Sequence, residues 1–342
     1  MKRENVGEQN RPETVKIKSM DLLSAENRLE VARQALEAYP LQPVEVTFLQ
    51  HSENLTFKVE AKEGTYLLRL HAPVTPAFGN HGANVLAVNS EMLWLEALRR
   101  ARFPVPTPVK TLKRDYVTRV EGLNATVLKW QSGEILTREM ETESTAAQIG
   151  SLVGRLHQQA MRWNQPKGFT RPRRDAAYFE QAMLSLWPAV EDGRISAQDY
   201  KTLQTAISWL SGEIRNLSQT RMTSGLLHGD LHRGNFLLYR GKIRLIDFSM
   251  SAFGHFAYDL GTCLSNVRSA YHPAFWEAYN RYMTLPRDSE RLIEAYFLGS
   301  YVVTFSLWIS DADSQETLIQ RVPLIAREYA ADFNREVHFW FE

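Results

Sequence analysis

The polar residues with the clearest chemical potential in this sequence lie on one short stretch, residues 226–239. His228, Asp230 and Asn235 stand in its first part, and the apolar run Phe236–Tyr239 follows at once. Such a pattern predicts a polar loop that leads into a buried strand. The strand fixes the position of the residue at which the loop before it ends. We therefore expect the three loop side chains to lie close enough together to converge on a ligand.

A second apolar strand brings another carboxylate to the same place. Arg240 and Gly241 predict a turn, and the strand Ile243–Ile246 that follows delivers Asp247, 17 positions after Asp230. A histidine two residues before the first aspartate, an asparagine five residues after it and a later aspartate have the order and spacing of a kinase catalytic loop and its metal-binding partner.

Phosphoryl transfer requires these residue types. Mg²⁺ is a hard cation that prefers oxygen ligands, so Asp247 and Asn235 suit that ion beside nucleotide phosphates. Asp230 is then left to accept the proton of an attacking hydroxyl group. The plainer alternative is that aspartates near a turn only make turn hydrogen bonds.

The segment His228–Asn235 resembles the HGDxHxxN signature of the aminoglycoside phosphotransferase/choline kinase family, and Ile246–Phe248 with Gly254 and Asp259 resembles that family's metal-binding segment. The resemblance extends from about residue 45 to 305. It implies an α+β, bilobal, protein-kinase-like fold with an N-terminal antiparallel sheet and helices and a larger, mostly helical C-terminal lobe. We expect an N-terminal arm at 1–19, an N-terminal lobe at 20–130 and a C-terminal lobe at 131–342.

The same resemblance implies a nucleotide site in the N-terminal lobe. The polar loop 50–55, with Ser52 and Asn54, stands where the family covers the nucleotide. Arg69 replaces the phosphate-pairing lysine of protein kinases, and Glu91 lies where a helix carboxylate pairs with that cation. Each of these residues has the alternative of an ordinary surface role.

The hinge between the lobes is expected at 128–131, where backbone groups beside Leu128 and Trp130 would meet the adenine edge; Trp130 either packs on the base or anchors the hinge. The resemblance makes Asp259 a support of the catalytic loop, and a start of a helix at Asp259 would let its carboxylate cap free N–H groups. His228 and His232 are expected to order the loop, and His157 to be a hydrogen-bonded structural histidine.

Composition excludes several other classes of protein. The chain has 342 residues, 44% hydrophobic residues and a net charge of +1, so no strong field attracts nucleic acid or an anionic membrane. The single cysteine, Cys263, excludes an internal disulfide, and we expect it to be buried on a helix. The run 301–309 is too short to span a bilayer, and no signal peptide is visible. These features favour a cytoplasmic protein. A monomer and a homodimer both stay open, because the sequence does not specify the oligomeric state.

Periodicity predicts the elements that position the site. Strands are expected at 44–49, 56–61, 65–70, 109–113, 116–120 and 125–130, and helices at 24–39, 85–101, 146–161, 176–187, 196–217, 273–282, 289–309 and 315–333. Residues 248–257 are expected to form a loop. Trp308, Asp311, Asp313 and Glu316 form an acidic and aromatic group that suits either an amine-bearing substrate or a solvated helix junction.

The predicted function is therefore transfer of the γ-phosphate of ATP, with Mg²⁺, to a hydroxyl group of a small molecule such as an amine, amino alcohol, antibiotic or related metabolite. Two alternatives stay open from the sequence: a Ser/Thr protein kinase of the same fold, and a non-catalytic nucleotide-binding or structural member of the family. The second is normally marked by loss of Asp230, Asn235 or Asp247, all of which are present.

Overall fold

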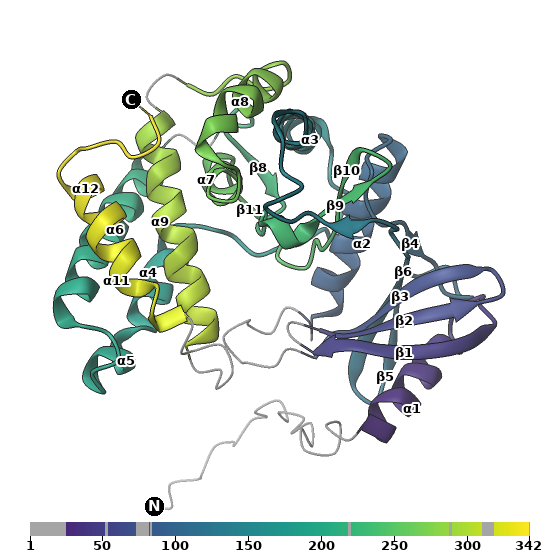
Figure 1. Cartoon of the computed structure of the whole chain (residues 1–342). Coiled ribbons are helices and arrows are strands. Elements are labelled where there is room, and N and C mark those ends of the chain that lie inside the picture. Colours follow the sequence, from purple (N-terminus) through teal and green to yellow (C-terminus); the bar gives the residue numbers. More distant parts are fainter. Residues whose placement is uncertain are drawn as a thin grey trace, which may run out of the picture.

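An antiparallel six-stranded sheet forms one part of the molecule, and a larger, mostly helical part contains the rest (Figure 1). The computed structural model describes residues 25–51, 54–72, 82, 84–217, 220–286, 289–309 and 318–341. The predicted arm at 1–19, Ser52, and Asp311, Asp313 and Glu316 of the acidic group lie outside the described residues.

The sheet has the order β1-β2-β3-β6-β4, and β5 pairs with β6. Its strands are β1 (Pro43–His51), β2 (Leu55–Ala61), β3 (Gly64–Leu70), β4 (Pro108–Val109), β5 (Val117–Val120) and β6 (Leu123–Lys129). Apolar side chains alternate along β2 and β3, so Phe57, Val59 and Leu68 are buried against helix α1 (Ala25–Leu36).

Helix α2 (Val85–Arg100) packs into the core of the larger part, although in the sequence it lies between strands β3 and β4 of the sheet. Asn84 caps its first turn by accepting hydrogen bonds from the N–H groups of Leu86 and Ala87. Trp94 and Leu98 are fully buried in the larger core, with side chains from β6 and from the helical part. This helix therefore joins the sheet to the helical part through shared core packing.

The helical part is built in chain order. Its α-helices are α3 (Glu143–Arg162), α4 (Ala176–Leu184), α5 (Trp187–Glu191), α6 (Ala197–Asn216), α7 (Ala257–Leu264), α8 (His272–Asn280), α9 (Ser289–Trp308), α11 (Val322–Leu324) and α12 (Ala331–Asn334), with a π-helical turn at Ile325–Ala330 between the last two. Cys263 is buried on α7 as predicted. The helix predicted at 176–187 ends early, because a new helix begins at Trp187 with Pro188 in its first turn.

Two small antiparallel sheets carry the polar loops. Strands β9 (Phe236–Tyr239) and β10 (Lys242–Leu245) form the predicted hairpin, joined by Arg240 and Gly241, both at positive φ, and β7 (Glu134–Ile135) pairs with β9. Strands β8 (Ser224–Leu227) and β11 (Ala252–His255) pair with each other. The prediction of a loop throughout 248–257 is therefore wrong at β11, where Phe253 lies opposite Leu226.

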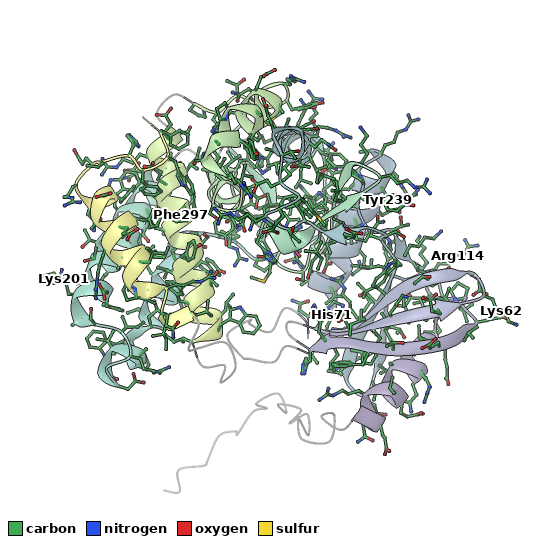
Figure 2. All side chains as sticks on the ribbon, in the orientation of Figure 1. Lys62, His71, Arg114, Lys201, Tyr239 and Phe297 are labelled. Carbon is green, nitrogen blue, oxygen red and sulfur yellow. The ribbon has the colours of Figure 1, made fainter. Side chains whose placement is uncertain are left out.

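Aromatic residues fill the space between α9 and the C-terminal segment. Phe297 lies on α9 (Figure 2). Its ring contacts the rings of Tyr301, Tyr329, Phe339 and Trp340. Trp308, from the group that the sequence made a candidate for substrate binding, is half-buried at the end of α9. Among the described residues, no helix combines the length and the apolar character needed to cross a membrane.

Candidate active site

Asp230 lies on the loop that directly follows β8, which we call the Asp230 loop (residues 228–235). The Asn235 side chain donates hydrogen bonds to the Asp230 carboxylate at 2.8 Å and to the Asp230 carbonyl at 2.9 Å. The Asp230 side chain keeps 31% of its surface exposed. The loop therefore holds one carboxylate in a fixed orientation with part of it accessible.

His232 adds a second hold on the same carboxylate. Its Nε2 lies 3.2 Å from an Asp230 carboxylate oxygen, and its Nδ1 accepts from the Gly234 N–H at 3.0 Å. Burial acts to raise the pKa of Asp230, but the His232 hydrogen bond, the charges of His232 and His228 and the Asn235 hydrogen bond outweigh it and lower the pKa below its usual value. Asp230 is thus kept as a carboxylate at neutral pH.

Asp259 supports the start of the loop from within the core. Its fully buried carboxylate accepts hydrogen bonds from the backbone N–H groups of His228 and Gly229, both at 2.9 Å, and lies 3.2 Å from Nε2 of His157. His157 also contacts the Tyr279 hydroxyl at 3.0 Å, which confirms it as a hydrogen-bonded structural histidine. The expectation that Asp259 caps its own helix is wrong: α7 already begins at Ala257, and the carboxylate is directed to the loop.

Gly229 is required by geometry at this position. Its φ is +81°, and a Cβ atom there would lie 2.3 Å from the Met250 carbonyl oxygen. The backbone of the Asp230 loop therefore approaches the loop after Asp247 more closely than any side chain at residue 229 would allow.

Asp247 begins a second loop, the Asp247 loop (residues 247–251), beside the first. Leu245 pairs with Phe236, and one residue further along the Ile246 N–H donates to the Asn235 carbonyl at 3.0 Å. The His228 Nε2 lies 3.0 Å from the Ile246 carbonyl oxygen. These bonds bring Asp247 next to the Asp230 loop, as the strand pattern predicts.

The backbone of Asp247 has φ +57°, a left-handed conformation that aspartate tolerates better than most residues. Its carboxylate accepts from the Ser249 N–H at 3.2 Å, and 43% of its side chain is exposed. Because the Asp247 carboxylate is partly exposed, it can bind a ligand without breaking a buried hydrogen-bond network.

The cation predicted on β3 is present and paired. Arg69 donates to the Glu91 carboxylate of α2 at 2.6 Å, and both side chains are buried. The predicted Arg69–Glu91 ion pair is therefore confirmed. A second guanidinium nitrogen of Arg69 lies 3.7 Å from the Asp247 carboxylate, so Arg69 links α2 to the Asp247 loop.

The remaining nucleotide-side residues have mixed positions. Asn54 is buried in the bend before β2. Leu128 is buried in β6, opposite Leu67 of β3. The Trp130 N–H donates to the Thr65 carbonyl at 3.0 Å, so this N–H is engaged in the sheet rather than open to an adenine edge. The half-exposed Trp130 ring instead contacts Lys58, whose amino nitrogen lies 5.6 Å from the ring centre.

Sequence reasoning missed two arginines near the site. Arg171 and Arg174 lie between α3 and α4, and both are buried and donate to carbonyl groups of the Asp247 loop. Their only signal in the sequence is a run of basic residues, Arg171 to Arg174, between two predicted helices. A basic run alone predicts a solvated surface, so the signal was too weak to identify them.

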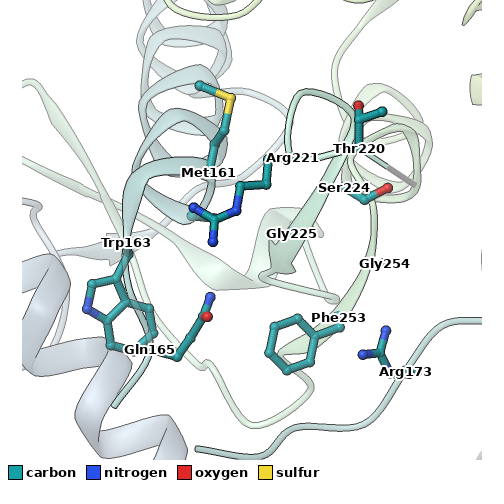
Figure 3. A pocket seen from close by; sticks show the side chains of 11 residues that line it. Met161, Trp163, Gln165, Arg173, Thr220, Arg221, Ser224, Gly225, Phe253 and Gly254 are labelled. Atoms are coloured by element: carbon teal, nitrogen blue, oxygen red, sulfur yellow. The ribbon is translucent and has the colours of Figure 1, made fainter. Parts of the chain in front are cut away.

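Two of the cavities among the described residues lie away from these loops. One of about 210 Å³ has Trp163, Phe253 and Arg221 in its walls and opens beside Ser224 at the start of β8 (Figure 3). Another, of about 710 Å³, lies between α6 and the start of α9. Since Asp230 follows the opposite end of β8, neither cavity contains the paired aspartates.

Metal-ligating groups in the described residues form no cluster of three His, Cys, Asp or Glu side chains. A site for Mg²⁺ beside phosphates needs fewer protein ligands, because the ion keeps several waters and takes oxygens from the nucleotide. The partly exposed carboxylate of Asp247 and the amide of Asn235, which stand on neighbouring loops joined by the bond from the Ile246 N–H to the Asn235 carbonyl, offer oxygen donors of the kind that such an ion binds.

The geometry and the comparisons with known proteins agree on the family. The sequence model of the phosphotransferase enzyme family matches residues 45–293, most of the chain, and the chain therefore belongs to this family. Amicoumacin kinase of Bacillus subtilis (strain 168) is 26% identical over 245 residues, which cover 70% of this chain and 68% of that protein.

Solved structures show the same fold. The structure of amicoumacin kinase hAmiN in complex with AMP-PNP, Ca²⁺ and Ami has a TM-score of 0.71 and 18% identity, and the match covers 94% of this chain and 96% of that chain. The microcompartment-associated aminopropanol kinase has a TM-score of 0.70 and 22% identity over 90% of this chain and 98% of that chain. The predicted family, the bilobal fold and the enzyme class, a small-molecule phosphotransferase, are thereby confirmed.

Proposed function

We propose that this protein transfers the terminal phosphoryl group of ATP to a hydroxyl group of a small molecule, with Mg²⁺ as the metal. The arrangement that carries the proposal is the pair of partly exposed aspartates on adjacent loops, with Arg69 and its Glu91 partner beside the second. Phosphoryl transfer asks a protein mainly for such positioning and charge neutralisation.

Asp230 is the proposed base. The acceptor oxygen forms a bond to the terminal phosphorus while the bond between that phosphorus and the bridging oxygen breaks, and ADP leaves with the bridging oxygen. Asp230 takes the hydroxyl proton. Its lowered pKa keeps it ready to accept that proton, and the bonds from Asn235 and His232 fix the direction of its free oxygen surface.

Asp247 and Asn235 are the proposed magnesium ligands. The ion would neutralise charge on the phosphate oxygens. Arg69 is proposed to contact the phosphates from the sheet side, because its ion pair with Glu91 keeps the guanidinium directed toward Asp247.

The acceptor is proposed to be a small hydroxyl compound. The similar proteins are named for amicoumacin and for aminopropanol, and the second name describes a small amino alcohol. Hydroxylated amines and antibiotics are therefore the first acceptors to test, and amino acids with a hydroxyl group follow.

The decisive experiment measures ATP consumption against a panel of these acceptors for the wild type and for Asp230→Asn. With the acceptor that the wild type uses, we expect turnover to fall about 10²–10⁴-fold, the usual contribution of a positioned base. Nucleotide binding should persist, since Asp230 is proposed to contact the acceptor proton rather than ATP.

Asp192→Asn is the matched control, because Asp192 lies on the surface in an ion pair with Arg194. Full turnover in Asp230→Asn would remove Asp230 from the proposed role. A wild-type protein that binds neither ATP nor Mg²⁺ in calorimetry would instead favour a structural member of the family.

A further inference from the structure

A short segment between α3 and α4 connects the Asp247 loop and β11 to helix α2. We call Thr170–Arg174 the connector. The Thr170 N–H donates to the Ser90 hydroxyl of α2 at 2.9 Å. At its other end, the Phe253 N–H donates to the Pro172 carbonyl at 2.7 Å, and the Arg174 N–H donates to the Phe253 carbonyl at 2.8 Å. The connector thus lies beside β11, which also pairs with β8, and its first residue is hydrogen-bonded to α2.

Within the connector, the Arg171 side chain donates hydrogen bonds both to the Asp247 loop and to α2. One nitrogen donates to the Ser251 carbonyl at 2.8 Å, a second donates to the Ala87 carbonyl in the first turn of α2 at 3.0 Å, and the third donates to the Ser249 carbonyl. The third nitrogen also lies 3.5 Å from the Phe248 carbonyl oxygen. A single buried guanidinium therefore holds the Asp247 loop against the helix that carries Glu91.

Only an arginine has the donors for this arrangement. The carbonyl groups of an irregular buried loop need hydrogen-bond donors, and a planar guanidinium supplies five in a fixed fork. A lysine has three donors around one point and cannot reach carbonyls on both α2 and the loop with the same geometry. Conversion of Arg171 to lysine therefore keeps the charge and removes the link.

Arg69 and Arg171 each connect helix α2 to the Asp247 loop. On one side, Arg69 joins Glu91 of α2 to Asp247 through side chains. On the other side, Arg171 joins α2 to the same loop through backbone carbonyls. Further along α2, the ring of Trp94 packs edge to face on the ring of Phe248, with their centres 5.3 Å apart. The Asp247 loop is therefore joined to α2 through Arg69, through Arg171 and through the ring of Phe248.

We propose that Arg171 is a positioning residue that sets Asp247 relative to the Arg69–Glu91 pair, and that it thereby controls the affinity for nucleotide-bound magnesium. This inference rests on the proposed role of Asp247 as a magnesium ligand. Arg171 itself is not proposed to touch the metal or the nucleotide. It acts through the loop backbone.

The test measures AMP-PNP binding by titration calorimetry, with and without Mg²⁺, so that no acceptor is needed. In Arg171→Lys we expect the gain in affinity that Mg²⁺ provides to fall about 10–100-fold, the usual effect of removing a support behind a metal ligand. Binding without metal should stay near the wild-type value. In the metal-free protein, hydrogen exchange of the amides at 248–253 should become faster.

Arg173→Lys is the matched control, because Arg173 is an exposed residue of the same connector whose guanidinium only lies over the Phe253 ring, 5.4 Å from its centre. It should behave like the wild type. Ser90→Ala gives a second, milder variant, since it removes the connector's bond to α2. We expect a smaller loss in the same direction, and Ser90→Ala decides the matter if Arg171→Lys does not fold.

The outcomes separate this inference from the proposed function. If Asp247→Ala loses the Mg²⁺-dependent gain while Arg171→Lys keeps it, or if Arg171→Lys weakens metal-free and metal-dependent binding in parallel, the inference about Arg171 is overturned and the function stands. If Asp247→Ala itself keeps the gain, the magnesium role of Asp247 fails.

Discussion

The two loops of the site are held by opposite chemical means. The Asp230 loop presents backbone N–H groups to the core, and the buried carboxylate of Asp259 accepts two of them. The Asp247 loop presents carbonyl groups, and the guanidinium of Arg171 donates to them. Buried backbone outside helices and strands leaves N–H or C=O groups without backbone partners, and these groups need side-chain partners. A carboxylate fills this need for the Asp230 loop, and a guanidinium fills it for the Asp247 loop.

The difference also sets how far each support reaches. Asp259 stands on α7 and acts within the helical part, where His157 and Tyr279 continue its hydrogen-bond chain. Arg171 reaches α2 as well and therefore connects the Asp247 loop to the helix whose Glu91 pairs with Arg69 of the sheet. We expect loss of the anion to affect the base and loss of the cation to affect metal binding.

The largest effect should come from Asp259→Asn. An amide keeps the shape but removes the charge, and its NH₂ group would face the N–H groups of His228 or Gly229. Breaking such a buried charged network typically costs about 3–5 kcal/mol of stability. Urea unfolding measures this loss, and hydrogen exchange should rise first at 228–235 rather than at 248–253.

Asp192→Asn serves as the control for this prediction too, since its exposed ion pair with Arg194 should contribute little to stability. Equal losses of stability in the two variants would contradict the special role given to Asp259. Faster exchange at both loops together would show that their supports are not separate.

Gly229→Ala should have the next largest effect and should disturb both loops. The new Cβ would meet the Met250 carbonyl oxygen at 2.3 Å, and φ is +81° at this residue. Strain of this kind costs about 1–3 kcal/mol, and kcat should fall because Asp230 is the next residue. Gly212→Ala is the control, because Gly212 lies within α6 with open space at its Cβ position. This substitution should stabilise the protein by about 0.5–1 kcal/mol. A Gly229→Ala variant with wild-type stability and kcat would contradict the close approach of the loops.

Local pattern was sufficient to predict part of this site. The β9–β10 hairpin and Asp247 follow from an apolar run, a turn and a second apolar run, all within 22 residues of Leu226. The Arg69–Glu91 pair could be predicted as well, because family spacing places both residues on regular elements whose faces are known in advance. Periodic structure carries its side-chain directions with it.

Contacts that depend on backbone groups far away in sequence could not be predicted. Arg171 bonds carbonyls 84 residues before it and 80 residues after it, and carbonyl groups leave no mark on residue type. The strands β8 and β11 were missed for a related reason: each has only four residues, including Gly225 or Gly254, and glycine is depleted in strands. The engagement of the Trp130 N–H likewise depends on strand register, which the sequence alone leaves open.

The smallest expected effect is a change in pH dependence in His232→Gln. Burial raises the pKa of Asp230, whereas the His232 hydrogen bond and charge are the largest of the influences that lower it. Without them the pKa of Asp230 should rise. A base works as the carboxylate, so the acid limb of the kcat/KM profile should move to higher pH, while kcat at pH 8 changes little.

His338→Gln is the control, because His338 bonds the Glu294 carboxylate at 2.9 Å near the C-terminal segment and not on the Asp230 loop. The stability effect has a matching sign: a carboxyl with a lowered folded-state pKa contributes stability above its unfolded pKa and loses it as pH falls through the folded value. This contribution should shrink in His232→Gln. An acid limb that stays in place would assign the low pKa of Asp230 to Asn235 and His228 instead, and the Asp230 loop would then depend on its backbone support more than on charge.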